Sequence, residues 1–138
     1  AIAAGLASLR IFKEDDVIAG LPPKMEMIRQ PFNRINEMEY VGDARQCGML
    51  GGIELMRDKA NRIPFDPSLL MAGGICQNAR KYGLIIRNIG DVIVFMPPLC
   101  STPAEIDEML SRLTKSMEEI FDRVRKQDVN AFSDPCAF

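Results

Sequence analysis

The chain of 138 residues contains no histidine. Histidine is the side chain that most often acts as a general base near neutral pH, because its own pKa lies there. Catalysis by this chain would therefore need a lysine, a carboxylate or a group supplied from elsewhere. The absence of imidazole also removes a common zinc ligand, and the four cysteines form no CxxC pair. The sequence thus excludes a metal site of the usual local spacing.

Cysteine is sparse and widely spaced, at Cys47, Cys76, Cys100 and Cys136. This spacing does not resemble the dense disulfide framework of a small secreted domain. We expect free thiols, mostly buried, in a reducing cytoplasmic environment. No apolar run approaches the roughly 20 residues that a membrane-spanning helix needs. The sequence therefore predicts a cytoplasmic protein that does not use the membrane as a partner.

An excess of positive charge is also missing. The 17 basic residues are scattered among 19 acidic ones, and the net charge is -2. Proteins that bind nucleic acid or an anionic membrane present a basic patch or stripe. We therefore expect no nucleic-acid partner. The length and the hydrophobic content of 47% are those of one soluble globular domain.

Helical periodicity is present from the first residues. Ile2, Leu6 and Leu9 recur at helical spacing, but no capping residue or polar lead-in precedes them. We interpret this as the downstream part of a longer polypeptide. A second apolar face over residues 22–38 predicts another helix. Pro31 should kink this helix or divide it into two short pieces, because proline removes a hydrogen-bond donor and clashes with the preceding turn.

Two pairs of extended segments follow. Residues 41–46 and 49–56 are separated by a short connection and predict an antiparallel pair. Gly51 and Gly52 inside the second segment indicate a bulge or the close approach of another backbone. Residues 83–96 predict two further strands around a turn.

Two more helices are marked by their capping residues. Asp66, followed by a proline, predicts the start of a helix that ends at Gly83. Thr102 and Glu105 form a capping box in front of the strongest helical signal in the chain. Its apolar stripe consists of Ile106, Met109, Leu110, Leu113, Met117, Ile120, Phe121 and Val124.

These elements predict the fold class. Helices packed on one face of a small, mostly antiparallel sheet make a two-layer α+β domain. We expect this domain to span residues 1–126. Residues 127–138 are polar and then apolar, and we expect a loosely held tail there.

One arginine is distinguished by its position. Arg87 ends an apolar strand directly before a turn, where Asn88 and Gly90 both tolerate positive φ. A guanidinium matches a carboxylate through two parallel hydrogen bonds, which a lysine cannot do. From the pattern alone, we favour the interpretation of Arg87 as a surface or salt-bridged residue.

An ordered set of segments resembles a known family. The C-terminal region of class III aminotransferases is similar to GLIIR at 83–87, GDVIVFMPPL at 90–99 and the helix start after Thr102. The strand pair that precedes this region in the family resembles VGDAR at 41–45 and GIEL at 52–55. The family includes the ω-amino acid:pyruvate, 4-aminobutyrate, ornithine and diaminopelargonate enzymes. The chain looks most like the ω-amino acid:pyruvate group.

The resemblance implies a role for Arg87. In many members, the arginine at this position binds the substrate α-carboxylate, and it swings aside when the amino donor has none. The family uses pyridoxal 5'-phosphate, but its catalytic lysine, its acidic partner and its phosphate-binding amides lie in an upstream large domain. None of the lysines of this chain stands in a matching context. We therefore expect no catalytic residue and no bound cofactor in this chain.

The implied function is transfer of an amino group from an amine or ω-amino acid to a keto acid such as pyruvate. This chain would be the small C-terminal domain of that enzyme and would be inactive by itself. Its implied partners are the large domain of the same polypeptide and a second copy, because the relatives are dimers or larger. The alternative is a non-enzymatic α+β binding or dimerisation module, which would use an apolar face to bind its partner.

Overall fold

The computed structural model describes residues 2–126, which form four helices, four strands and two short 3₁₀ turns. The helices are α1 (Ile2–Glu14), α2 (Leu21–Asn36), α3 (Met71–Ala79) and α4 (Pro103–Arg125). The strands are β1 (Val41–Cys47), β2 (Leu50–Leu55), β3 (Arg87–Ile89) and β4 (Val92–Phe95), and the 3₁₀ turns are Pro67–Leu69 and Arg80–Tyr82.

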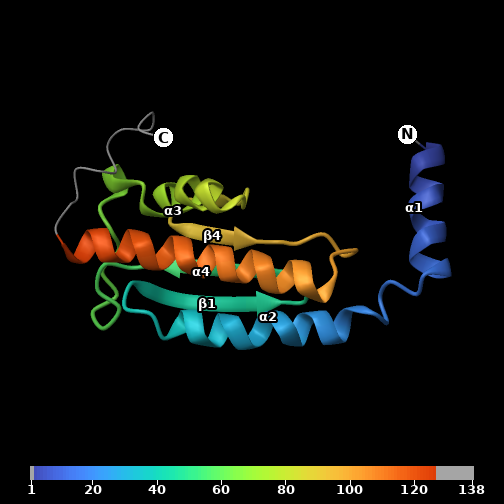
Figure 1. Ribbon diagram of the computed structural model, residues 1–138, viewed down its shortest axis with the longest axis horizontal. Helices are drawn as coiled ribbons and strands as arrows, with labels where there is room; N and C mark the ends of the chain where they lie inside the picture. Colours follow the sequence, from blue (N-terminus) through green and yellow to red (C-terminus); the bar gives the residue numbers. More distant parts are fainter. Residues whose placement is uncertain (1, 127–138) are drawn as a thin grey trace.

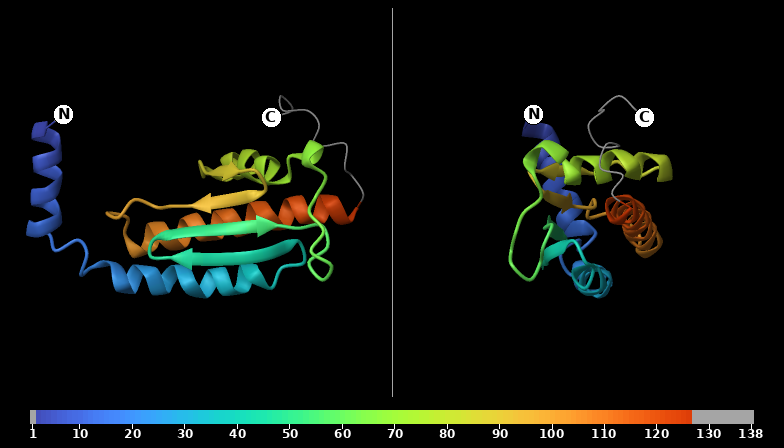
Figure 2. Two further views of the ribbon diagram at one scale, coloured as in Figure 1. Left: turned by 180° about the vertical axis from the view of Figure 1, so that it is seen from behind. Right: turned by 90° about the vertical axis from the view of Figure 1, so that its left-hand side faces the viewer.

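The strands form one antiparallel sheet in the order β1-β2-β4-β3. Helices α2, α3 and α4 pack together over one face of this sheet (Figures 1 and 2). Ile53 and Ile93 are paired across β2 and β4 and are fully buried beneath the helices. The expected two-layer α+β class is therefore confirmed.

Helix α4 has the start and the apolar stripe that the sequence predicts. The Glu105 backbone N–H donates to Oγ1 of Thr102 at 3.3 Å, and the Thr102 N–H donates to Oε2 of Glu105 at 2.7 Å. These two bonds satisfy N–H groups that a helix start leaves without intrahelical acceptors. The buried members of the stripe are Ile106, Leu110, Leu113, Met117, Ile120 and Phe121.

Helix α2 is not divided at Pro31. It continues as one helix from Leu21 to Asn36, with Pro31 inside it. Proline removes one N–H donor from the helix, while Ile28, Phe32 and Ile35 on both sides of it are buried against the core. The prediction of two separate pieces is wrong because the packing of this apolar face holds the helix together across the missing bond.

The helix predicted from Asp66 to Gly83 is broken near its start. Asp66 does cap a helical turn, since its carboxylate accepts from the Ser68 N–H at 2.9 Å. That turn is a short 3₁₀ segment, and Leu70 then adopts a left-handed conformation with φ 47° before α3 begins. Capping chemistry marks where a helical turn starts, but it does not fix how far the helix runs. Gly83, with φ 76°, ends the following 3₁₀ turn as predicted.

The sheet carries its irregularity in β1. The pairing register shifts between Val41 and Asp43, which places the bulge in β1 and not at Gly51 and Gly52.

Three cysteines are described, and all are free. Cys76 is buried, but Cys47 and Cys100 are exposed, so the expectation of mostly buried thiols is wrong. Cys47 is the last residue of β1, and Cys100 lies in the loop that follows Pro97 and Pro98. Cys136 lies outside the described residues.

Helix α1 stands apart from the two layers (Figure 1). It buries none of its side chains, and its apolar residues Ile2, Leu6 and Leu9 are exposed.

None of the helices between residues 2 and 126 is long and apolar enough to cross a membrane. The expected tail at 127–138 lies outside the described residues.

Candidate functional site

The face of the sheet that the helices leave open carries one row of residues across all four strands. Arg45 on β1 pairs with Gly52 on β2, Gly52 pairs with Val94 on β4, and Val94 pairs with Arg87 on β3. Side chains of directly paired residues point to the same face of a sheet. Three strand spacings separate the two ends of the row, so the Cα atoms of Arg45 and Arg87 lie about 14 Å apart.

An open hollow of about 500 Å³ lies over this row. Gly52 has no side chain, so the middle of the row is low, while both arginines line the hollow at its ends. The other lining residues that project most are apolar, with exposed fractions of 48% for Leu50, 63% for Ile89 and 62% for Met96. The hollow thus combines an apolar surface with two guanidinium groups, and apolar surfaces with a few placed polar groups are typical of ligand sites.

Arg45 is neutralised by its neighbours. Its Nη1 donates to Oδ2 of Asp43 at 2.8 Å and to Oε2 of Glu54 at 2.9 Å. The hydrogen bonds that Arg45 donates to Asp43 and then to Glu54 raise its pKa above the ordinary value. Two carboxylates around one guanidinium leave this end of the row with a net negative charge. An anionic ligand would be repelled there.

Arg87, at the other end of the row, has no carboxylate paired with it among the described residues. It is exposed on β3, and among residues 2–126 no hydrogen bond or ion pair reaches its guanidinium. It also lines a second hollow, of about 220 Å³, that includes Leu84, Pro97 and Met109. Of the two arginines on the row, Arg87 is therefore the one available to an incoming carboxylate.

The position of Arg87 along its strand differs from the prediction. Arg87 begins β3, because residues 84–86 are not paired in the sheet. The turn that follows is the predicted one: Gly90 has φ 56°, and Nδ2 of Asn88 donates to the Gly90 carbonyl at 2.8 Å. Of the two interpretations favoured from the pattern, a surface or a salt-bridged arginine, the structure shows a surface arginine, since Arg87 is exposed and unpaired within the described residues.

The sequence interpretation missed the arrangement around Arg45. The alternation of strand residues could have placed Asp43 and Arg45 on one face, because side chains two positions apart point the same way. No sequence signal identified Glu54 as the second carboxylate. Only the pairing of β1 with β2 brings it to Arg45.

The residues around the hollow do not suit a pyridoxal-type cofactor. Such a cofactor needs a lysine for covalent attachment, and within the described chain no lysine lines the hollow. Lys24 is used elsewhere, since its Nζ donates to the Leu99 carbonyl at 2.8 Å. Lys115 lies with its Nζ 4.6 Å from the centre of the Tyr82 ring. Residues 2–126 also contain no cluster of three or more potential metal ligands.

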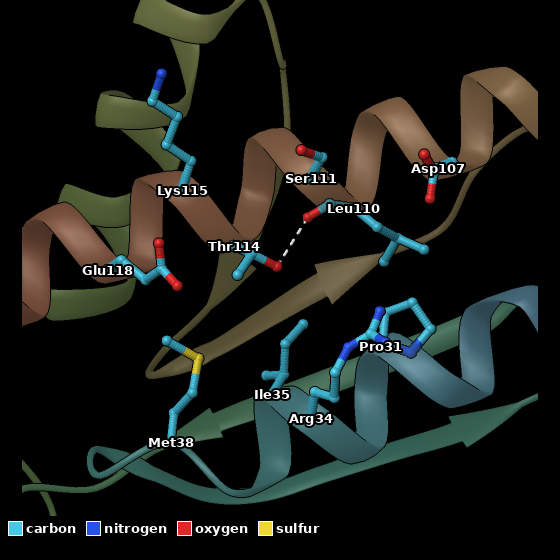
Figure 3. Close-up of a pocket in the computed structure, with 10 residues that line it drawn as sticks. All are labelled: Pro31, Arg34, Ile35, Met38, Asp107, Leu110, Ser111, Thr114, Lys115 and Glu118. Carbon is cyan, nitrogen blue, oxygen red and sulfur yellow. Dashed lines mark hydrogen bonds between the residues drawn. The ribbon is translucent and has the colours of Figure 1, made fainter.

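A larger hollow of about 730 Å³ lies between α2 and α4, on the helical side of the domain (Figure 3). Its floor includes Ile35, Met38 and Leu110, and Thr114 uses its hydroxyl to donate to the Leu110 carbonyl at 2.9 Å. Lys115 points away from α2 in this view. The hollow contains neither Arg87, the site residue predicted from the sequence, nor any residue of the four strands. We therefore place the candidate site on the sheet.

A partly buried polar network joins α3 and the 3₁₀ turn after it to α4. Glu119 accepts hydrogen bonds from the Tyr82 hydroxyl at 2.7 Å and from Nδ2 of Asn78 at 2.9 Å, and it forms an ion pair with Arg123. The bond from Tyr82, followed by that from Asn78, lowers the pKa of Glu119 to about 2. The bonds from Asn78 and Tyr82 connect α3 and the 3₁₀ turn after it to α4, while the ion pair with Arg123 lies within α4, so we assign this network to stability.

Comparison with known proteins identifies relatives of this domain. The family described as Aminotransferase class-III matches residues 1–117. An adenosylmethionine-8-amino-7-oxononanoate aminotransferase of Geobacter sulfurreducens is 40% identical over 118 residues, which are 86% of this chain and 26% of that protein. A putrescine–pyruvate aminotransferase of Pseudomonas aeruginosa is 28% identical over 121 residues, again 86% of this chain and 26% of the relative.

Solved structures of aminotransferases have the same fold as this domain. The adenosylmethionine-8-amino-7-oxononanoate aminotransferase of Methanocaldococcus jannaschii has a TM-score of 0.81 at 33% identity, over 84% of this chain and 26% of that one. An omega-transferase of Vibrio fluvialis has a TM-score of 0.83 at 27% identity, over 87% of this chain and 28% of the other. The chain thus spans about a quarter of the length of these relatives. Sequence and fold together show that this chain belongs to the class III aminotransferase family.

Proposed function

We propose that this chain acts as the small domain of a pyridoxal-phosphate-dependent aminotransferase and that Arg87 binds the carboxylate of the keto-acid acceptor. The observation that carries the proposal is the unpaired, exposed guanidinium of Arg87 at the edge of an apolar hollow. A carboxylate docked there would form charge-assisted hydrogen bonds, and its carbon chain could lie on Ile89 and Met96.

The names of the relatives support a carboxylate-bearing acceptor. One relative is named for 8-amino-7-oxononanoate and another for pyruvate, and each of these two compounds contains a carboxylate and a carbonyl group. We propose a keto acid of this general class as the acceptor and an amine or ω-amino acid as the donor. The family membership favours this function over a non-enzymatic binding or dimerisation module.

The cofactor would be held outside this chain. When bound, pyridoxal 5'-phosphate carries the amino group from donor to acceptor. The residues around Arg87 provide no lysine for it, so we propose that the large domain of a longer polypeptide holds the cofactor and the catalytic lysine. This chain would then orient the acceptor and exclude water, and by itself it would be inactive. We further propose that the complete enzyme is a cytoplasmic homodimer.

The test uses the complete enzyme with Arg87→Ala. Loss of a charge-assisted, two-bond contact should raise the KM for a keto-acid acceptor by roughly 10- to 100-fold. Turnover of a simple amine donor that lacks a carboxylate should change little. Pyruvate and 8-amino-7-oxononanoate are the acceptors to assay, with each half-reaction followed separately by cofactor absorbance.

Arg45→Ala is the matched control, because Arg45 lies on the same row of the sheet but is already paired with two carboxylates. It should leave the acceptor KM nearly unchanged. An acceptor KM that stays at the wild-type value in Arg87→Ala would refute the role of Arg87.

A further inference from the structure

Helix α1 carries apolar side chains on two opposite faces. At 3.6 residues per turn, Ile2, Leu6 and Leu9 fall on one face, and Ala4, Ala7 and Ile11 fall on the face about half a turn away. No charged residue occurs before Arg10. Every residue of α1 is nevertheless exposed, with exposed fractions of 55% for Leu6, 68% for Leu9 and 53% for Ile11.

The longest helix of the domain has a different pattern. Helix α4 buries one apolar stripe that includes Ile106 and Leu113, and it presents charged residues such as Glu108 and Glu118 on its exposed side. A helix that is apolar on all sides is typical of a position buried within a larger body. A helix of 13 residues is also only marginally stable in water without packing. The sequence of α1 therefore calls for contacts that residues 15–126 do not supply.

The connection from α1 to α2 does not fix α1 against the two layers. Residues 15–20 contain no buried side chain, and Asp16 turns the chain with φ 47°. Gly20, at the start of α2, forms no side-chain cap. Helix α1 lies away from both the sheet and the other helices (Figures 1 and 2). The position of α1 is thus set by something other than packing within this domain.

The comparisons indicate what covers α1. The match to the class III aminotransferase family includes the whole of α1, so this helix belongs to the part of the chain that the family shares. The chain spans only about a quarter of the length of the relatives, so most of each relative lies outside the matched region. A second copy of the chain, related by a two-fold axis, would cover one face of α1 and leave the opposite face in water. A surrounding body covers both.

We propose that α1 is an element of the large domain, packed inside it on both apolar faces, and that the small domain begins with α2. Residues 15–20 then form the connection between the body that holds the cofactor and the sheet that carries Arg87. This inference rests on the proposed function, in which the chain is the small domain of a longer polypeptide. It moves the domain boundary from the expected residue 1 to the segment 15–20.

Hydrogen exchange tests this placement without any substitution. The amides of residues 6–14 are measured in the complete enzyme and in the chain of residues 1–138. They should exchange quickly in the chain and at least roughly 100-fold more slowly in the complete enzyme, because only there is α1 covered. Residues 110–121 of α4 should be protected in both proteins and serve as the internal control. Fast exchange at residues 6–14 in the complete enzyme would overturn the inference.

Two substitutions probe the two faces separately. Leu6→Asp places a charge on the first face, and Ala7→Leu adds volume to the second at little cost in helix propensity. Each should lower the thermal midpoint of the complete enzyme by about 5 °C or more, since each disturbs a packed surface. Each should leave the midpoint of the chain of residues 1–138 unchanged, because both positions are exposed there. Leu113→Ala, at a fully buried position, is the matched control and should destabilise both proteins.

The second face distinguishes the large domain from a second copy of the chain. If Leu6→Asp destabilises the complete enzyme while Ala7→Leu does not, only one face of α1 is covered, and the inference is wrong. Analytical ultracentrifugation of the chain of residues 1–138 gives the complementary result. A dimer that Leu6→Asp dissociates, with residues 6–14 protected in that dimer, would identify a second copy as the partner and would also reject the inference.

The outcome is separable from that of the proposed role of Arg87. An unchanged acceptor KM in Arg87→Ala together with protected residues 6–14 removes the role of Arg87 and leaves the placement of α1 standing. A raised KM together with unprotected residues 6–14 removes the placement alone. If the complete enzyme with Leu6→Asp does not fold, Leu6→Ala makes a smaller change at the same position. A midpoint for Leu6→Ala equal to that of the wild type would then count against the packing of this face.

Discussion

The ring of Phe32 on α2 fills the space that a side chain at Gly51 on β2 would occupy. A Cβ built on Gly51 would lie 2.3 Å from Cζ of Phe32, and that ring is almost fully buried. The ring also packs against that of Phe95 on β4 in a tilted arrangement, with a centroid distance of 6.0 Å and an interplanar angle of 58°. The helix layer can sit this close to the sheet only because β2 has no side chain at this point.

Gly51→Ala should therefore destabilise the domain. Neither Phe32 nor the β2 backbone can move away without disturbing the core, and overpacking of this kind costs about 1–3 kcal/mol. Gly52→Ala is the matched control on the open face, where the nearest atom to a new Cβ is Cγ1 of Val92 at 3.4 Å, an ordinary contact. The free energy of unfolding in urea measures both variants. Equal stabilities for the two would contradict the close approach of Phe32.

Glu119 should make the stability of the domain depend on pH in the acid range. Its pKa is lowered from 4.5 to about 2 by the bonds from Tyr82 and Asn78. A lowered pKa in the folded state stabilises the fold above the unfolded pKa, and this contribution is lost as the pH falls from about 4.5 toward 2. Glu119→Gln should lose on the order of 2 kcal/mol at pH 7, and its difference from the wild type should shrink below pH 4.

Glu118→Gln is the control for this prediction. Glu118 is the preceding residue of α4, is exposed, and has no polar partner among residues 2–126. Urea unfolding at pH 7, 4 and 3 should show little change for Glu118→Gln. A pH dependence of Glu119→Gln equal to that of the wild type would rule out the assigned network.

The described cysteines should react at different rates. Burial raises the pKa of the Cys76 thiol to about 11, and the thiolate is the reactive form. Cys47 and Cys100 are exposed and accessible to reagent. Iodoacetamide at pH 8 should therefore modify Cys47 and Cys100 well before Cys76, with the sites located by peptide mass spectrometry. Cys76 should react once the chain is unfolded in urea, and equal native rates at all three positions would contradict the structure.

Local signals predicted the elements that depend on neighbours in sequence. The capping box of Thr102 and Glu105 and the apolar stripe after it specified α4, because helix bonds and helix faces arise within a few residues. The turn at Asn88 and Gly90 was predicted for the same reason. The errors at Pro31 and Leu70 occurred where packing against distant residues overrode or interrupted a local preference.

The candidate site was predicted only in part. The resemblance to class III aminotransferases pointed to Arg87, and the family is confirmed, but its carboxylate-binding role stays a proposal. The neutralised state of Arg45 could not be predicted, since Glu54 is nine residues away along the chain and reaches Arg45 through the sheet.

By itself, the sequence determined helix α4, the turn at Gly90, the α+β class and the family, because these follow from local periodicity, capping chemistry and the order of short segments. Only the tertiary structure decided which of the two arginines on the open face is free. The charge that a guanidinium presents to a ligand depends on which carboxylates lie within hydrogen-bonding distance. Strand pairing sets those distances, and it joins residues that the linear sequence keeps apart.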